Sequence, residues 1–258
     1  MTLLHNIAAR RRGLTLLELL VVITILIAIS GIVVATLPGL LNRTATATDV
    51  ANVSQIDATV KRHMVLRQGR VGDRFDSLLT GQTRSGQVAD YVGGSENFTA
   101  IDLKDTDVVA LNALGITELI PAAENTNNAT FESHVGEPVK ISGNSRVCAI
   151  NPDVAEQLMQ DIWNIKPEDQ KLYLIFGIGS RCSLVGGATE ATFGEAPVHF
   201  SDNALSNPKT MYSRYLIVIE LDRNSDGQSR ARYIGTAIPG FNGLESLGQK
   251  LQQHYSSG

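Results

Sequence analysis

The stretch that decides the fold begins Arg10-Arg11-Arg12-Gly13-Leu14-Thr15-Leu16-Leu17-Glu18 and continues through nineteen uncharged residues, Leu19–Leu37. A helix of that length reaches roughly 28 Å, close to the hydrocarbon thickness of a bilayer. The three arginines precede it with no acidic residue upstream, so the positive-inside rule keeps the N-terminus cytoplasmic. Hydropathy alone therefore predicts one transmembrane helix, with the chain from Pro38 onward outside the inner membrane.

Glu18 is unusual in this stretch, because an unpaired carboxylate at the edge of an apolar span is unfavourable. A basic leader that ends in Gly13, followed by Leu14 and by glutamate as the fifth residue after the glycine, resembles the N-terminus of type IV pilin-like proteins. The resemblance covers Arg10 to Leu41. It implies that prepilin peptidase cuts between Gly13 and Leu14 and methylates the new amino group of Leu14. It also implies that Glu18 pairs with the N-terminal amine of a neighbouring subunit in a filament.

Two alternative interpretations of this stretch remain open. In the first, Glu18 lies at the depth of the lipid headgroups and pairs with nothing. In the second, the stretch is a cleavable secretory signal with Ala28-Ile29-Ser30 as its cleavage site, and the mature chain starts at Gly31. The apolar run continues to Leu37, past that site, which favours the pilin-like interpretation.

The resemblance and the hydropathy together predict four parts: a leader at 1–13, a transmembrane helix at 14–41, an amphipathic continuation at 42–68 and a globular head at 69–258. Pro38-Gly39 and the polar run after it predict a kink, and Gln68-Gly69 predicts the end of the helix. The expected fold class is α+β, a pilin-like long N-terminal transmembrane and amphipathic helix packed on an antiparallel β-sheet head. The apolar face of the continuation consists of Val50, Val53, Ile56, Val60 and Met64.

The head contains four runs that are rich in β-branched and aromatic residues and bounded by Gly, Asn or Asp. Helices are expected where Asn151-Pro152 opens Asp153–Ile165 and where Gly115 ends Thr106–Leu114. The segment Gly69–Thr99 is expected to be a long surface connection. The predicted strands are Val147–Ile150, Lys171–Phe176, Tyr215–Leu221 and Arg232–Ile238, the last two as an antiparallel hairpin.

The sequence gives little indication of an enzyme. It has no Gly-x-Ser-x-Gly, no His-Glu-x-x-His and no phosphate-binding Gly-Lys-Ser/Thr. Gly177-Ile178-Gly179 lacks the third glycine of a dinucleotide fingerprint, since Cys182 stands there, and a strand end explains it better. The histidines, including His199, share no ligand spacing and are expected to be surface or satisfied core residues. We therefore expect no catalytic residues.

The charge of the chain argues against a nucleic-acid partner. The formal net charge is −4, and removal of Met1–Gly13, with three arginines and no acid, leaves −7. A nucleic-acid-binding domain generally presents a basic face.

Cys148 and Cys182 both lie in the part of the chain that is expected to be exported. An even number of cysteines in an oxidising compartment favours one disulfide. By the loop-entropy model, that bond would stabilise the folded chain by about 3 kcal/mol. Two separate buried thiols are the alternative.

The loop Asp222-Arg223-Asn224-Ser225-Asp226-Gly227 matches the first half of a calcium-binding loop. Asp222, Asn224 and Asp226 supply oxygens at alternate positions, and the glycine permits the sharp turn. The bidentate acid expected at the twelfth position is absent, since Tyr233 stands there. Calcium is thus a possible cofactor, and an ordinary turn between strands is the alternative.

The predicted function is that of a structural subunit of a type IV pilus-like filament, specifically a pseudopilin of a type II secretion system. Its expected partners are prepilin peptidase, other pilin-like subunits, membrane lipid, and the inner-membrane assembly platform with its ATPase. The expected location is the inner membrane, with the head in the periplasm, and then the filament. The alternative is a signal-anchored periplasmic binding or enzymatic module with an uncleaved N-terminus.

Overall fold

The computed structural model describes residues 15–80, 86–92, 95–122, 137–166, 168, 170–187, 192–199, 212–224, 226–240 and 243–245. Within these ranges it gives the backbone alone at 32–43, 45–46, 161–162, 239–240 and 243–245. The expected leader and Leu14 lie outside the described residues. The chain forms two compact units, Met1–Arg43 and Thr44–Gly258, and each is described by itself.

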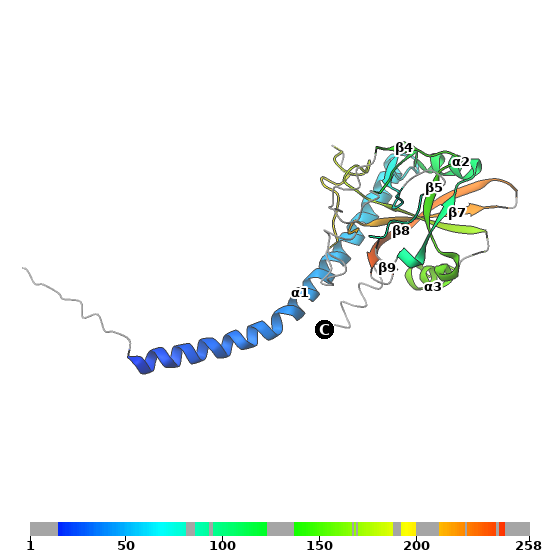
Figure 1. The fold of residues 1–258 in the computed structure, drawn as a ribbon. Coiled ribbons are helices and arrows are strands. Elements are labelled where there is room, and N and C mark those ends of the chain that lie inside the picture. The colour runs from blue at the N-terminus through cyan, green and yellow to red at the C-terminus, as the bar shows by residue number, and fades with distance from the viewer. Residues whose placement is uncertain are drawn as a thin grey trace, which may run out of the picture. The chain divides into compact units, whose positions relative to one another are not determined.

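Helix α1 comprises Leu16–Leu66 and so contributes to both units (Figure 1). The kink expected near Pro38 does not interrupt it. Beyond its end, Gln68 (φ 57°) and Gly69 (φ 92°) adopt left-handed conformations, and the Gly69 N–H donates to the Met64 carbonyl at 2.7 Å. Such a left-handed pair after the last turn satisfies carbonyls that the helix leaves without partners.

The second unit is built on a nine-stranded sheet of the order β4-β3-β1-β6-β7-β8-β9, in which β5 pairs with β6 and β2 (Figure 1). Two α-helices and one 3₁₀ turn accompany it: α2 Asp105–Leu114, α3 Pro152–Trp163 and η1 Ser95–Asn97. The strands are β1 Arg74–Asp76, β2 Phe98–Asp102, β3 Glu118–Ile120, β4 Val139–Lys140, β5 Arg146–Ile150, β6 Lys171–Gly177, β7 Leu216–Arg223, β8 Ser229–Gly240 and β9 Gly243–Glu245.

The central strands β6 and β7 are buried on both faces, so successive residues belong to different hydrophobic clusters. Leu174 and Ile217 lie in the first cluster, together with residues of α2 and of the 44–66 part of α1. Ile175 and Val218 lie in the second cluster, together with Met159 of α3. Side chains alternate between the faces of a strand, so a strand covered on both sides needs apolar residues at nearly every position.

Local signals predicted several elements correctly. All four predicted strands form, and β7 and β8 are an antiparallel hairpin. Asn151 caps α3 by accepting a hydrogen bond from the Asp153 N–H at 3.2 Å, with Pro152 in the first turn. Gly115 (φ 106°) ends α2 in a left-handed conformation. Each of these signals acts over a few residues and needs no distant partner.

The expected fold class is wrong. The sheet is mixed rather than antiparallel, because β1 and β3 run parallel, with Phe75 opposite Leu119. Parallel neighbours require a long crossover, and the chain supplies it through β2 and α2. The transmembrane part of the expectation also lacks support: over the residues that the structure describes, no helix has the length and apolarity needed to cross a membrane.

The segment Gly69–Thr99 is not the surface connection that its composition suggested. It contributes β1, and the side chains of Phe75, Leu79 and Tyr91 are buried in the two hydrophobic clusters. The buried pieces are short, so composition averaged over the whole segment missed them.

Candidate functional site

The described chain begins with a capping box that joins Thr15 and Glu18. The Thr15 N–H donates to Glu18 Oε2 at 2.8 Å, and the Glu18 N–H donates to Thr15 Oγ1 at 3.3 Å. This reciprocal pair starts α1 by satisfying two backbone donors that a helix N-terminus leaves free. The signal was present in the sequence as Thr-x-x-Glu before an apolar run, and our sequence analysis did not use it.

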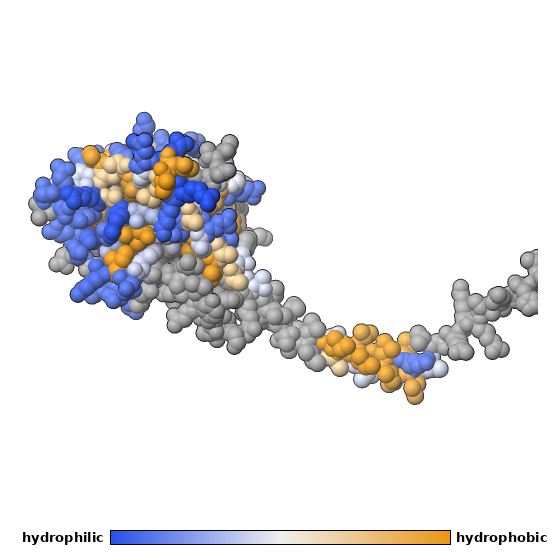
Figure 2. Space-filling model, turned by 180° about the vertical axis from the view of Figure 1, so that it is seen from behind, coloured by the Kyte–Doolittle hydropathy of each residue, from blue (hydrophilic) through white to orange (hydrophobic). Residues whose placement is uncertain are grey.

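The apolar residues that follow Glu18 are exposed. Leu16 retains 82% of its accessible surface and Ile27 retains 68%. Figure 2 shows this stretch of the helix as a nearly continuous hydrophobic surface. The other large apolar side chains that are exposed here are Leu17, Leu19, Leu20, Val21, Val22, Ile23, Ile25, Leu26 and Ile29. A surface of this kind is typical of a segment that a lipid or another protein covers.

The expected disulfide between Cys148 and Cys182 is wrong, because both cysteines are free and buried. Cys148 lies in β5 within the second hydrophobic cluster, whereas Cys182 follows β6 and belongs to the first. The two thiols therefore belong to different cores. Burial raises the pKa of the Cys148 thiol to about 12 and that of the Cys182 thiol well above its usual range, so both resist ionisation.

The hairpin loop that was expected to bind calcium is a turn with its own hydrogen bonds. Asp226 Oδ1 accepts from the Gln228 N–H at 3.0 Å, and the Gly227 N–H donates to the Asn224 carbonyl at 3.1 Å. The Asn224 amide is best oriented with its nitrogen toward the Asp222 carboxylate, at 3.0 Å. Among the described residues, no group of three or more His, Cys, Asp or Glu side chains is arranged to hold a metal ion.

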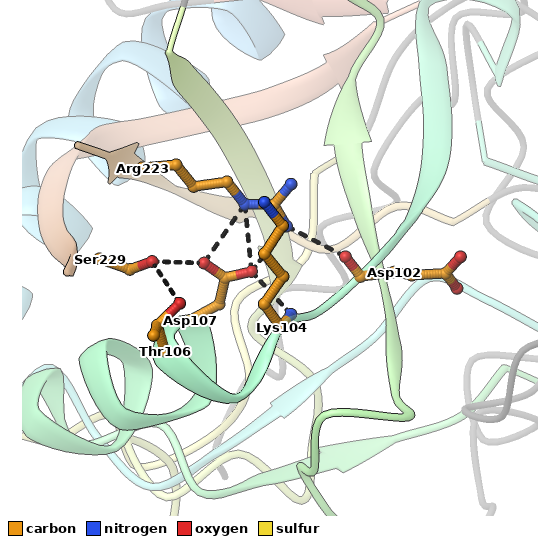
Figure 3. Close-up of polar contacts among 6 residues, drawn as sticks. All are labelled: Asp102, Lys104, Thr106, Asp107, Arg223 and Ser229. Carbon is orange, nitrogen blue, oxygen red and sulfur yellow. Dashed lines mark hydrogen bonds and ion pairs between the residues drawn. The ribbon is translucent and has the colours of Figure 1, made fainter. Parts of the chain in front are cut away.

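A buried ion pair next to this loop fastens the hairpin to α2 (Figure 3). The Asp107 side chain is completely buried, and Arg223 Nη2 donates to its Oδ2 at 2.6 Å. Ser229 Oγ donates to Asp107 Oδ1 at 2.6 Å, and the Lys104 N–H donates to Oδ2 at 2.8 Å. Burial alone would raise the pKa of Asp107, but these hydrogen bonds and the Arg223 charge outweigh it and lower that pKa.

Arg223 also donates from Nη2 to the Asp102 carbonyl at 3.0 Å (Figure 3). Its guanidinium thus joins β7 to the end of β2 and to the first turn of α2. Sequence analysis considered Arg223 only as a residue of the hairpin loop, and missed this role because Asp107 lies 116 residues away in sequence.

A second buried carboxylate, Asp76, lies at the end of β1. The Tyr212 hydroxyl donates to its Oδ2 at 2.9 Å. Burial raises the pKa of Asp76 to about 7, although this hydrogen bond and the charges of Arg214 and Arg181 act in the opposite direction.

Gly177 and Gly179 leave the space that the Tyr212 hydroxyl and the Asp76 carboxylate occupy. A side-chain carbon at Gly177 would overlap the Tyr212 hydroxyl, and one at Gly179 would overlap the Asp76 carboxylate. The Gly-Ile-Gly sequence therefore marks the end of β6, as expected, and the place where a carboxylate and a phenol lie against the backbone.

A third buried polar cluster joins α1 to the loops at the edge of the second unit. Asp49 Oδ1 lies 2.8 Å from His199 Nδ1, and the Tyr215 hydroxyl donates to the same oxygen at 3.4 Å. The backbone N–H of His199 donates to the Ser213 carbonyl at 2.7 Å. His199 is thus a satisfied core histidine, as expected. Each of the three polar clusters joins segments that are distant in sequence.

We predict that Arg223→Ala lowers the free energy of unfolding by about 3–5 kcal/mol, because it leaves the Asp107 carboxylate buried without its cation. The matched control is Lys61→Ala. It removes the exposed cation of the Lys61–Asp57 helix pair, in which the two charges lie 2.7 Å apart, and should cost at most about 1 kcal/mol. Chemical denaturation of both variants provides the measurement. Equal losses would show that the buried pair contributes no more than a surface pair.

A second prediction concerns pH. The folded chain keeps a proton on Asp76 up to about pH 7, whereas the unfolded chain loses it near 3.8. The folded state therefore binds more protons in between, and the free energy of unfolding falls as pH rises, by up to about 1.4 kcal/mol per pH unit from this group. Asp76→Asn, which cannot titrate, should lack this contribution.

The measurement is urea denaturation of the natural chain and of Asp76→Asn from pH 4 to pH 8. The natural chain should lose stability relative to the variant as pH rises through this window. A difference between the two chains that stays constant with pH would refute the proposed titration.

Comparison with known proteins gives no relative: no family model matches the chain, and neither a curated protein nor a solved structure matches it significantly.

Proposed function

We propose that this chain is a structural subunit of a type IV pilus-like filament, of the pseudopilin kind found in type II secretion systems. It assembles through its N-terminal helix and carries out no catalysis. The observation that carries the proposal is the run of exposed apolar side chains between Leu16 and Ile29, which directly follows the Thr15–Glu18 capping box.

The exposed apolar side chains of this run must be shielded from water both before and after assembly. We propose that lipid of the inner membrane covers it before assembly, with Arg10–Arg12 keeping the N-terminus cytoplasmic. In the filament, the helices of neighbouring subunits replace the lipid. Because both environments are apolar, the gain on assembly comes from side-chain packing and from polar pairs rather than from the removal of water. The work of extraction then falls to an ATP-driven assembly platform.

Glu18 has two roles in this proposal. Within one chain its carboxylate accepts the Thr15 N–H and begins the helix. After prepilin peptidase has removed the leader, the free amine of Leu14 in a neighbouring subunit would pair with the Glu18 carboxylate and set the axial register. A charge pair in apolar surroundings specifies register because loss of either partner leaves the other charge without compensation.

A glutamine in place of Glu18 separates the helix-capping role from the charge-pairing role. Glu18→Gln keeps an oxygen that can accept the Thr15 N–H, so the helix cap remains, but it removes the charge. Glu18→Ala removes both. We predict that both variants are cleaved and inserted normally and that neither enters filaments. The measurement is the fraction of processed chain recovered in sheared filaments, beside the N-terminal mass of the chain.

The matched control is Thr24→Ala, which removes a polar group from the same helix, where Thr24 Oγ1 donates to the Leu20 carbonyl at 2.8 Å. This variant should assemble like the natural chain. Normal assembly of Glu18→Gln together with failure of Glu18→Ala would reduce Glu18 to a helix cap.

The N-terminal mass tests the proposal as a whole. A methylated Leu14 supports the filament subunit. An intact Met1 supports the anchored periplasmic module, and a start at Gly31 indicates a secreted protein.

Calcium in the hairpin loop stays a prediction that the filament role does not require. If Asp222, Asn224 and Asp226 hold the ion, a chelator lowers the melting temperature, calcium restores it, and Asp226→Ala abolishes the response. Identical melting curves with chelator and with calcium would eliminate the site.

A further inference from the structure

A cavity of about 250 Å³ lies in the second unit, at the place where the chain leaves α1. Its wall combines the end of that helix, the segment before β1, the turn after α2 and the loop after β6. The lining residues are His63, Arg67, Arg70, Gly72, Asp73, Gly115 and Ser183. These parts are distant in sequence, so the cavity exists only in the folded chain.

Two of the lining side chains are exposed guanidinium groups. Among the described residues, neither Arg67 nor Arg70 forms an ion pair, whereas Arg223 binds Asp107 and Arg232 binds Glu220. A simpler role for the two arginines is to complement the negative end of the helix dipole. However, two carbonyls of this turn already have backbone partners. The Arg67 N–H donates to the His63 carbonyl at 2.8 Å, and the Gly69 N–H donates to that of Met64.

Ser183 adds a donor to the same wall. Its Oγ accepts the Asp73 N–H at 2.9 Å and the Arg74 N–H at 3.4 Å. A hydroxyl has two acceptor lone pairs and one proton to donate. Because backbone donors engage both lone pairs, Ser183 Oγ can form a further hydrogen bond only by donating its proton. Among the described residues, no group accepts that proton.

The backbone around the cavity is fixed before any ligand binds. Gly72 (φ 136°) and Gly115 (φ 106°) have positive φ values that other residues adopt only with strain. A side-chain carbon at Gly72 would lie 2.8 Å from Ser183 Oγ, and one at Gly115 would lie 2.9 Å from Arg70 Cβ. The two glycines thus allow the segments to approach closely. A preformed wall lowers the entropy cost of binding a ligand.

Asp73 adds a second condition on the ligand, because its carboxylate is a negative charge in a lining that also contains Arg67 and Arg70. It weakens the attraction for a bare anion and can accept hydrogen bonds from hydroxyl groups. The volume is several times the roughly 30 Å³ that one water occupies in the liquid, which leaves room for a small organic molecule. The lining therefore suits a molecule with an acidic group at one end and hydroxyls beside it.

We propose that this cavity binds a small hydroxylated molecule that carries an oxyanion, of the sugar phosphate or sugar acid class. Arg67 and Arg70 pair with the oxyanion, and Ser183 donates a hydrogen bond to it. Asp73 accepts from the hydroxyls. Phosphate and carboxylate share this chemistry, because arginine forms charge-assisted and often bidentate hydrogen bonds with both.

The test is isothermal titration calorimetry on the full chain in uncharged detergent. The probes are glucose 6-phosphate, glucuronate, glucose and inorganic phosphate. Either acidic sugar should bind saturably and more tightly than inorganic phosphate, and glucose should not bind. The tighter of the two acidic sugars identifies the acidic group. Failure of both acidic sugars to bind would overturn the proposal.

Arg67→Gln and Arg70→Gln should each weaken binding of the acidic sugar about tenfold or more, because each removes a charge-assisted contact. Both side chains are exposed, so folding should be unaffected. The matched control is Arg62→Gln, which removes the same charge from an exposed position of α1 that does not line the cavity. Equal weakening in all three variants would reduce the effect to net charge and overturn the proposal.

Asp73→Asn separates the two halves of the site. It should strengthen binding of inorganic phosphate, because a nearby negative charge is lost. It should also lower the ratio of the affinity for glucose 6-phosphate to that for inorganic phosphate. The reason is that an amide oxygen accepts hydrogen bonds from the sugar hydroxyls less strongly than a carboxylate does. An unchanged preference would contradict the role of Asp73 in the proposal.

Discussion

The second unit depends on the burial of β6 and β7 on both faces. Their side chains alternate between two hydrophobic clusters, so neither face of this strand pair is suited to contact with water. Each face therefore needs its own cover. The first cluster contains residues of α2 and of the 44–66 part of α1, and the second contains residues of α3. The remaining strands extend the sheet on either side of this centre.

Three of the buried carboxylates in this apolar framework, Asp107, Asp76 and Asp49, have different polar partners. Asp107 has a full guanidinium partner and several donors, so its charge is stabilised. Asp76 has a phenol as its direct partner and more distant arginines, so burial dominates, raises its pKa to about 7 and favours the protonated form below that pH. Asp49 shares one oxygen with a histidine and a tyrosine. Each pairing joins segments that are far apart in sequence, so polar contacts as well as apolar burial fix the arrangement of the second unit.

The first unit has the opposite character. Its described helix begins with a polar cap and then exposes apolar side chains at nearly every position. Within the part of the chain that the structure describes, these side chains stay exposed. The contrast with the second unit, whose apolar residues are buried in two clusters, supports the proposal that the N-terminal helix is the part that associates with other molecules.

The sequence by itself determined the features that depend on near neighbours. These are the β7–β8 hairpin, the Asn151 cap of α3, the Gly115 end of α2 and the amphipathic spacing before Gln68-Gly69. It also determined the Thr15–Glu18 cap, although we read that glutamate for its charge alone. Hydrogen-bond caps, positive φ values and residue periodicity act within a few positions, so a short window contains the whole signal.

Only the tertiary structure decided the pairings between distant segments. The parallel β1–β3 pair, the separation of the two cysteines, the Asp107–Arg223 pair and the basic cavity all join residues that local patterns cannot relate. Strands of two or three residues, such as β1 and β4, carry too few positions for a period to be recognised. Their existence depends on the free energy of the whole packed sheet, because burial and pairing with distant strands must offset the entropy lost when each segment is ordered.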